Sequence, residues 1–184
     1  MELQETGFAG CFELQGNVFK DIRGSFVKTY QHDIFAALGL STDWKEEYYS
    51  VSGKDVIRGM HFQTPPADHA KLVYCLQGEV LDVVLDLRVN SPTFLQCLSF
   101  RLSPQQGNSI YIPSGMAHGF LSLTEGSVMQ YKVTSEYSPR HDAGVLWSSI
   151  DFDWPVDKPV VSTRDEQHPV LTKFISPFGM VPNE

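Results

Sequence analysis

The segment KLVYCLQGEVLDVVLDL, residues 71–87, carries the clearest secondary-structure signal in the chain. Apolar residues dominate two runs on either side of Gln77-Gly78, a pair suited to a tight turn, so the segment predicts two strands joined as a hairpin. Similar runs, bounded by Gly, Pro, Asn and Ser, occur at 18–30, 96–102, 109–112 and 127–134. Many short strands separated by turn residues indicate an all-β chain.

Only residues 33–40 (DIFAALGL) look helical, with Asp33 as the expected N-cap and Gly39 near the end. We find no internal repeat, low-complexity segment or linker, and 184 residues suit one domain spanning 1–184. Short antiparallel strands close naturally into a jelly-roll or cupin-type barrel, here with short flanking helices. We expect the Pro-rich tail from Trp154 onward to wrap the surface.

The composition narrows the class of partner. Hydrophobic residues make up 42% and charged residues 20% of the chain, a globular balance, and the net charge of −8 disfavours nucleic acid and anionic membranes. A local basic pocket can still bind one small diphosphate. Three widely spaced cysteines predict free thiols in a reducing compartment, and neither a leader-like N-terminus nor an apolar run of 18 residues is found. We therefore expect a cytoplasmic protein.

Two histidine motifs bear on the choice between metal and proton chemistry. Residues 107–118 (GNSIYIPSGMAH) fit the second cupin motif, in which a Pro-x-Gly turn delivers His118 into the barrel. The first cupin motif normally offers His-x-His, but residues 58–63 (RGMHFQ) supply His61 alone. A transition-metal site needs about three protein ligands, so we predict a barrel without metal or cofactor.

The chain resembles the dTDP-4-dehydrorhamnose 3,5-epimerase family along nearly its whole length. The matching motifs are, in order, 19–26 (FKDIRGSF), 56–63 (VIRGMHFQ), Lys71, 78–82 (GEVLD), 91–94 (SPTF), 113–120 (PSGMAHGF), 131–132 (YK), 137–139 (YSP), 154–155 (WP) and 162–165 (STRD). In that family a lysine and two tyrosines follow the catalytic histidine by 10, 70 and 76 positions. Lys71, Tyr131 and Tyr137 follow His61 at those spacings.

The resemblance implies four catalytic roles in removing and returning a proton next to a ketone. His61 would be the base, since an imidazole with a pKa of about 6.5 is largely neutral at cytosolic pH. Asp165 would pair with His61, Lys71 would donate to the developing enolate oxygen, and Tyr131 would return a proton from the opposite face. The structural alternatives are a core or interface tyrosine, a solvated strand lysine and a surface turn at Asp165.

The resemblance also implies a nucleotide-diphosphate-sugar ligand and a homodimer that exchanges an N-terminal strand. Arg23, Arg58 and His118 would surround the sugar and diphosphate, although Arg23 could instead pair with Asp21 or Glu47. The remaining binding residues would be Phe19, Phe26, Gln63 and Tyr137. His32, His69, His141 and His168 belong to no motif, and we expect them at the surface.

Around the nucleobase the chain departs from the family, offering Lys28, Glu46 and Tyr48 in place of the usual polar residues. A lysine donor and a glutamate acceptor would complement cytosine better than thymine, so a CDP-linked sugar rivals a dTDP-linked one, unless Lys28 and Glu46 merely pair with each other. The 147–154 stretch is also about two residues shorter than usual. Open alternatives are a single-centre epimerase or ketoisomerase, a cupin that only binds a sugar nucleotide, and a metal-dependent oxygenase.

Overall fold

The computed structural model describes residues 1–179 and consists mainly of strands. The strands are β1 (Glu2–Glu5), β2 (Phe12–Gln15), β3 (Val18–Asp21), β4 (Gly24–Val27), β5 (Glu46–Ser52), β6 (Ile57–Gln63), β7 (Lys71–Gln77), β8 (Val80–Asp86), β9 (Cys97–Leu102), β10 (Asn108–Ile112), β11 (Met116–Ser122), β12 (Ser127–Val133) and β13 (Asp142–Gly144). The helices are α1 (His32–Ala37) and α2 (Thr163–Glu166), with 3-10 turns η1 (Trp147–Ser149) and η2 (Leu171–Lys173).

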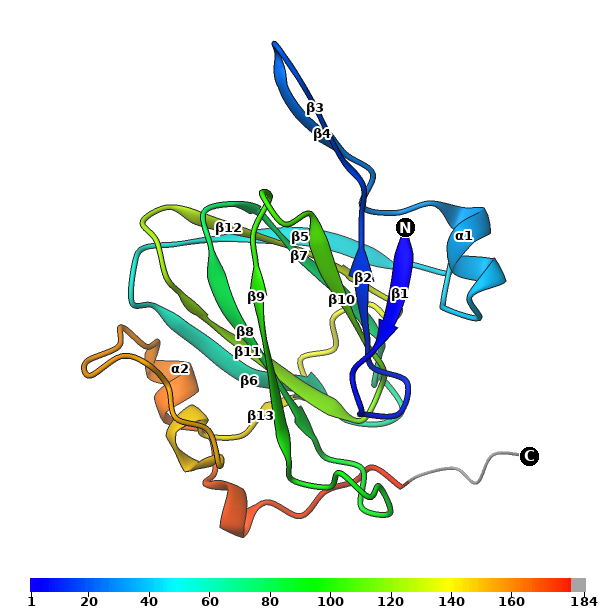
Figure 1. Ribbon diagram of the computed structural model, residues 1–184. Helices are drawn as coiled ribbons and strands as arrows, with labels where there is room; N and C mark the ends of the chain where they lie inside the picture. Colours follow the sequence, from blue (N-terminus) through cyan, green and yellow to red (C-terminus); the bar gives the residue numbers. More distant parts are fainter. Residues whose placement is uncertain (180–184) are drawn as a thin grey trace.

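Two antiparallel sheets face each other and form the barrel (Figure 1). One sheet has the strand order β1-β2-β10-β7-β12-β5, and the other has the order β13-β6-β11-β8-β9. This arrangement confirms the predicted all-β, cupin-type fold with short flanking helices. The runs predicted at 96–102, 109–112 and 127–134 become β9, β10 and β12.

The predicted hairpin at 71–87 is wrong in its pairing, although both strands exist. β7 hydrogen-bonds to β10 and β12 in one sheet, whereas β8 hydrogen-bonds to β9 and β11 in the other. The turn crosses between the sheets at Gly78, which has φ +79°, and a Cβ there would lie 2.4 Å from Thr124 Oγ1. Both strands are largely buried on both faces, so their apolar runs lack the alternation that would indicate which strands pair.

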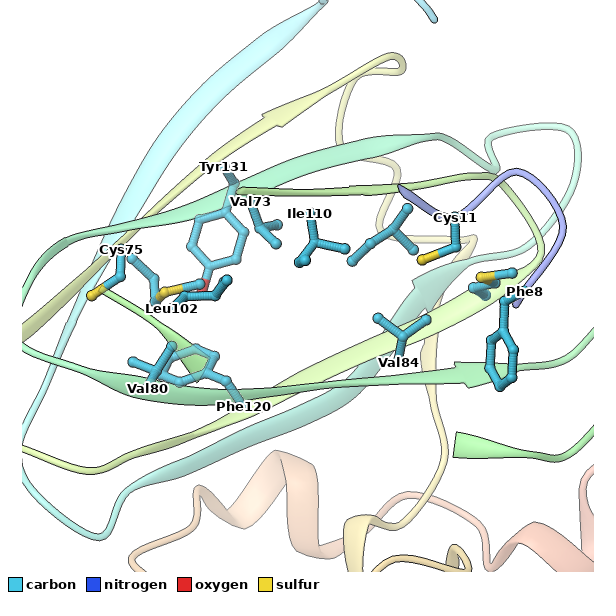
Figure 2. Packing of buried hydrophobic residues seen from close by; sticks show 13 residues of the cluster. Phe8, Cys11, Val73, Cys75, Val80, Val84, Leu102, Ile110, Phe120 and Tyr131 are labelled. Atoms are coloured by element: carbon cyan, nitrogen blue, oxygen red, sulfur yellow. The ribbon is translucent and has the colours of Figure 1, made fainter. Parts of the chain in front are cut away.

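The main core lies between the two sheets (Figure 2). It includes Val73 of β7, Val84 of β8, Ile110 of β10 and Phe120 of β11, and Tyr131 of β12 points into the same interior. Separate apolar clusters cover the outer faces, one beneath α1 and one beneath the C-terminal segment. The barrel therefore has side chains from both sheets converging on its interior.

Helix α1 begins one residue earlier than expected, and the predicted N-cap is wrong. The N-cap is Gln31, which makes no side-chain cap hydrogen bond. Asp33 lies inside the first turn, where a carboxylate still interacts favourably with the helix dipole. Gly39 follows the helix with φ +71°, as expected for a residue that ends one.

The C-terminal segment packs against the barrel. Val160 forms a bridge with Val56, and Phe178 packs against Met60 and Phe62 on the outer face of the five-stranded sheet. The same segment carries Asp165, which is 3% exposed. The tail therefore wraps the surface as expected, and its buried residues Asp165 and Phe178 anchor it to the barrel.

The β3–β4 hairpin projects away from the barrel (Figure 1). Its aromatic residues Phe19 and Phe26 are 58% and 59% exposed.

The three cysteines are free, as predicted. Within residues 1–179, no helix is long and apolar enough to cross a membrane.

Candidate active site

A cavity of about 480 Å³ opens into the barrel and gathers most of the predicted site residues. Its lining comes from both sheets and from the segments beside them. The lining residues are Glu46, Tyr48, Ser50, Arg58, His61, Phe62, Gln63, His69, Lys71, His118, Phe120, Tyr131, Val133, Tyr137, Asp142 and Arg164. The predicted acid and base therefore share one cavity, His61 from β6 and Tyr131 from β12 in the facing sheet.

A histidine–carboxylate pair lies on the β6 side of the cavity. His61 Nε2 is 2.8 Å from Asp165 Oδ1, and Asp165 Oδ2 accepts a hydrogen bond from the Gly59 N–H at 3.1 Å. Burial lowers the pKa of His61, and the Asp165 carboxylate opposes this shift. Burial disfavours ionisation of Asp165, but the hydrogen bonds from His61 and Gly59 together hold its pKa below the ordinary value. The pair is a neutral imidazole oriented by an ionised carboxylate.

Lys71 supplies a buried amine beside this pair. It is the first residue of β7, is 6% exposed, and its Nζ donates to the His61 carbonyl at 3.2 Å. Burial lowers the pKa of Lys71 to about 8, with Asp142 and Asp82 opposing the shift. Among the described residues, no carboxylate lies within 4.0 Å of this amine, so its charge can interact with a ligand.

Tyr131 is held from two sides. Its hydroxyl lies 3.1 Å from Ser50 Oγ, and its ring stacks on Tyr48 with centroids 4.9 Å apart. Burial raises the pKa of Tyr131, so the phenol stays protonated at neutral pH. Burial also raises the pKa of Tyr48 to about 12. A protonated, fixed phenol is able to act as a proton donor.

His118 brings a second carboxylate that the sequence reasoning did not single out. His118 Nε2 is 2.7 Å from Asp82 Oδ2, and both side chains are buried. Burial raises the pKa of Asp82, and the charge of His118 opposes this. A signal existed in the sequence, because Asp82 interrupts the apolar run of β8.

The predicted binding residues Gln63 and Tyr137 are coupled through one loop. Gln63 Oε1 accepts from the Ser138 N–H at 2.6 Å, and its Nε2 donates to the Ala67 carbonyl at 2.8 Å. The Tyr137 N–H donates to Glu46 Oε1 at 2.9 Å. Gln63 therefore lines the cavity, but its side-chain amide hydrogen-bonds to the backbone and stabilises the loop that carries Tyr137.

Two basic side chains also reach the cavity. Arg58 donates from Nε to Ser52 Oγ at 3.0 Å and from Nη2 to the Val51 carbonyl at 3.1 Å. Arg164, which the sequence reasoning missed, is 2.8 Å from Asp142 through Nη2. The cavity therefore combines cationic groups with aromatic walls.

Four predicted binding residues do not join this cavity. Phe19, Arg23, Phe26 and Lys28 lie on or just after the projecting β3–β4 hairpin and line separate cavities. Arg23 pairs with Asp21, its Nε 3.1 Å from Oδ1, which was the alternative reading of this arginine. The described part of the chain contains no ion pair between Lys28 and Glu46. Within one chain these four residues lie apart from the cavity, because the hairpin points away from its own barrel, and their part in ligand binding stays a prediction.

Two histidines expected at the surface lie inside. His69 Nδ1 is 2.9 Å from Ser135 Oγ, and burial, followed by the charge of Lys71, lowers the pKa of His69 to about 3. The side chain of His168 is 12% exposed, and its Nε2 lies 3.8 Å from Asp165 Oδ1. Neither residue belongs to a sequence motif that would have marked it.

His61, Asp165 and His168 form the one group in residues 1–179 whose donor atoms lie close enough together to suggest a metal, all within 4.8 Å. However, His61 and Asp165 already satisfy each other through a short hydrogen bond. That arrangement fits proton transfer better than metal ligation. The metal-free barrel stays a prediction, which metal analysis of the purified protein can test.

Known proteins match the chain along almost its whole length. The family model for dTDP-4-dehydrorhamnose 3,5-epimerase matches residues 5–173. The Salmonella typhimurium enzyme of that name is 39% identical over 175 residues, covering 93% of this chain and 96% of the relative. The Bacillus anthracis enzyme, solved with TDP and PPi bound, superimposes with a TM-score of 0.89 at 36% identity, covering 92% of this chain and 99% of that one.

A further solved structure is similar to the same extent. The Legionella pneumophila epimerase, in complex with dTDP-4-keto-L-rhamnose, has a TM-score of 0.89 and 30% identity, covering 95% of this chain and 94% of its own. The family model and these relatives all name 3,5-epimerases of dTDP-linked deoxysugars. The chain belongs to the dTDP-4-dehydrorhamnose 3,5-epimerase family.

Proposed function

We propose that this protein epimerises a dTDP-linked 4-keto-6-deoxyhexose at the carbons that flank the ketone, C3 and C5. The observation that carries the proposal is the His61–Asp165 pair on one sheet and the Tyr131 hydroxyl on the facing sheet, both open to one cavity. Inversion of a carbon needs a base on one face and an acid on the other, and this cavity offers both.

The four catalytic roles follow from the state of each group. The lowered pKa of His61 keeps it neutral and able to accept the proton, and Asp165 stabilises the imidazolium that forms. Lys71 donates to the developing enolate oxygen, where one donor typically contributes about 3–4 kcal/mol. The protonated Tyr131 returns a proton to the opposite face. These roles need no metal or cofactor.

We infer the identity of the nucleotide from the relatives and from the polar residues that line the cavity. The Bacillus anthracis structure holds TDP and the Legionella pneumophila structure holds a dTDP-sugar. Arg58 and His118 are the cationic and hydrogen-bonding groups proposed for the sugar and diphosphate. Glu46 and Tyr48 lie at the same cavity, so the cytosine hypothesis stays a prediction.

We also propose a homodimer in which the β3–β4 hairpin of one protomer completes the cavity of the other. The hairpin carries Phe19, Arg23 and Phe26, exposes its aromatic side chains and does not reach its own cavity. The family resemblance implies such an exchange near the N-terminus. The free thiols favour the cytoplasm as the compartment. We further propose that residues 1–184 form one epimerase domain.

The reaction is tested by solvent exchange. The protein is incubated in deuterium oxide with 4-keto-6-deoxyglucose linked to dTDP, CDP, UDP or GDP, and NMR locates the label at C3 or C5. We expect labelling and inversion at both carbons with the dTDP-sugar. Tight binding without exchange would leave only a sugar-nucleotide-binding protein, and preferential turnover of the CDP-sugar would support the cytosine hypothesis.

The shared site is tested by complementation between two inactive variants. Arg23→Ala and His61→Asn homodimers should both be nearly inactive. After unfolding and refolding together, a heterodimer has one cavity with wild-type His61 and a wild-type partner hairpin, so about a quarter of wild-type activity should return. No recovery, with dimers still formed, would contradict the exchange.

A further inference from the structure

His168 lies next to the His61–Asp165 pair, and its ring has no hydrogen-bond partner in the part of the chain that the structure describes. Its buried Nε2 contacts no donor or acceptor at hydrogen-bonding distance among the described residues. The nearest charged oxygen recorded for it is Asp165 Oδ1 at 3.8 Å, the same oxygen that bonds His61. The His168 ring meets the His61 ring edge-on, with centroids 5.7 Å apart. Such an unpaired buried nitrogen is costly and calls for an explanation.

A glycine makes the space that His168 occupies. Gly144 of β13 pairs directly with His61 of β6, and a Cβ at Gly144 would lie 2.4 Å from His168 Nε2. The His168 ring therefore packs directly against the Gly144 backbone, next to His61. The main chain on either side is fixed as well, since the Gln167 N–H donates to the Arg164 carbonyl at 3.1 Å and the Leu146 N–H donates to the Pro169 carbonyl at 2.9 Å. The position of the ring is thus built into the fold.

The surroundings select one tautomer of His168. With the proton on Nε2, an N–H dipole faces the ionised carboxylate of Asp165, whereas with the proton on Nδ1 a lone pair faces it. A separation of 3.8 Å is too long for a hydrogen bond, but charge–dipole attraction persists over that distance in a water-poor interior. The Nε2–H tautomer is therefore favoured.

We propose that His168 is a positioning residue for proton transfer. Its ring excludes water from Asp165 Oδ1, and its Nε2–H partly offsets the negative charge of that oxygen beside His61. This proposal rests on the proposed epimerase function, in which His61 is the base. The N–H dipole weakens the pull of Asp165 on a proton at His61, so His61 stays neutral over a wider pH range. Burial also keeps His168 itself uncharged, since it lowers the pKa of that ring.

Other charged groups surround His61, and the test has to hold them constant. They are Asp165 and Arg164 from the α2 segment, Lys71 from β7, Asp142 from β13, and Arg58 and His118 along the cavity wall. None of these is altered by changing His168 or Gly144. A change in the titration of His61 in such variants therefore reports on the His168 ring.

The experiment titrates His61 by NMR in the ligand-free, full-length protein, using labelled histidine. His168→Phe keeps a ring but removes the N–H, and should raise the His61 midpoint by about half a pH unit or more. His168→Gln restores an N–H donor and should return the midpoint towards the wild-type value. The acid limb of kcat/KM should move with the midpoint.

Gly144→Ala provides an independent variant if His168→Phe fails to fold, because its methyl group displaces the His168 ring without changing a titratable residue. It should raise the His61 midpoint in the same direction. Gly179→Ala is the matched control, since a Cβ at Gly179 meets nothing within 4 Å, and it should leave the midpoint unchanged.

An unchanged His61 midpoint in folded His168→Phe and Gly144→Ala proteins would overturn the positioning role, even if both lose thermal stability. A failure of the proposed function gives a different result: the wild-type protein would show no deuterium exchange, whatever the titration of His61.

Discussion

Replacing Lys71 with methionine should make the protein more stable and much less active. Lys71 is almost completely buried, and its pKa falls from 10.5 to about 8. At about 1.36 kcal/mol for each pKa unit, keeping this amine charged at pH 7 costs the folded state about 3 kcal/mol. Methionine fills a similar volume without the charge.

Part of that gain is lost with the hydrogen bond from Lys71 Nζ to the His61 carbonyl. A hydrogen bond from a charged donor contributes about 1.5–3 kcal/mol, so the net gain should be about 1 kcal/mol. Turnover should fall by about 100- to 1000-fold, because the enolate oxygen loses its donor. The residue would thus be retained for activity at the expense of stability.

The effect has a defined pH dependence. Because the folded pKa lies below the unfolded pKa, the destabilisation by Lys71 is fully present below about pH 8 and disappears as the pH rises through 10.5. The stability advantage of Lys71→Met should therefore shrink between those values. It should reverse at high pH, where the wild-type protein loses the charge penalty.

Urea denaturation at pH 7 and at pH 10 measures the stability, and deuterium exchange measures the turnover. Lys45→Met is the matched control, since Lys45 forms an exposed pair with Asp43 and should change neither quantity appreciably. If Lys71→Met is markedly less stable at pH 7, or retains activity within threefold of wild type, then the charged, enolate-facing amine inferred here is incorrect.

Three other outcomes are expected. Tyr131→Phe should lower the yield of inverted product by about 100-fold or more while exchange at the same carbon persists, which NMR of the recovered sugar would reveal; loss of exchange and inversion together would argue against Tyr131 as the acid. Gln63→Leu leaves the Ser138 N–H unpaired, and should destabilise the fold by about 2 kcal/mol and raise KM more than it lowers kcat, as denaturation and steady-state kinetics can show. The pH profile of kcat/KM should fall on the acid side with a midpoint below 6.5, where His61 becomes protonated, and on the alkaline side near pH 8, where Lys71 loses its proton; an acid midpoint well above 6.5 would contradict a neutral His61.

Strand positions could be predicted from the sequence, whereas strand partners could not. Residues 71–87 show two apolar runs and a turn, and these became β7 and β8. Since both strands are largely buried on both faces, their side chains do not alternate between polar and apolar. The turn at Gly78 has the same residue type whether it joins two neighbouring strands or two facing sheets. Pairing is therefore a property of the whole barrel and is not encoded locally.

The site divides in a similar way. His61, Lys71 and Tyr131 could be identified because they recur at fixed spacings within a known pattern. Asp82 left only a weak signal, as a carboxylate within the apolar run of β8, because its partner His118 lies 36 residues away. His168 belongs to no motif, although it follows Asp165 by three residues, and its place beside His61 depends on the folded chain. The hairpin residues Phe19 and Arg23 were assigned to a pocket that their own chain does not bring to them.

The two-sheet architecture itself explains why the base and the acid are far apart in the sequence. In the proposed mechanism a substrate carbon between the sheets has one face towards β6 and the other towards β12, so the proton that His61 removes would be replaced from the opposite side by Tyr131. Two groups on one face of one sheet could only return the proton where it came from. Strands β6 and β12 belong to different sheets, so the proposed inversion depends on a chain that alternates between the two sheets, the same property that makes the pairing of β7 and β8 unpredictable from the sequence.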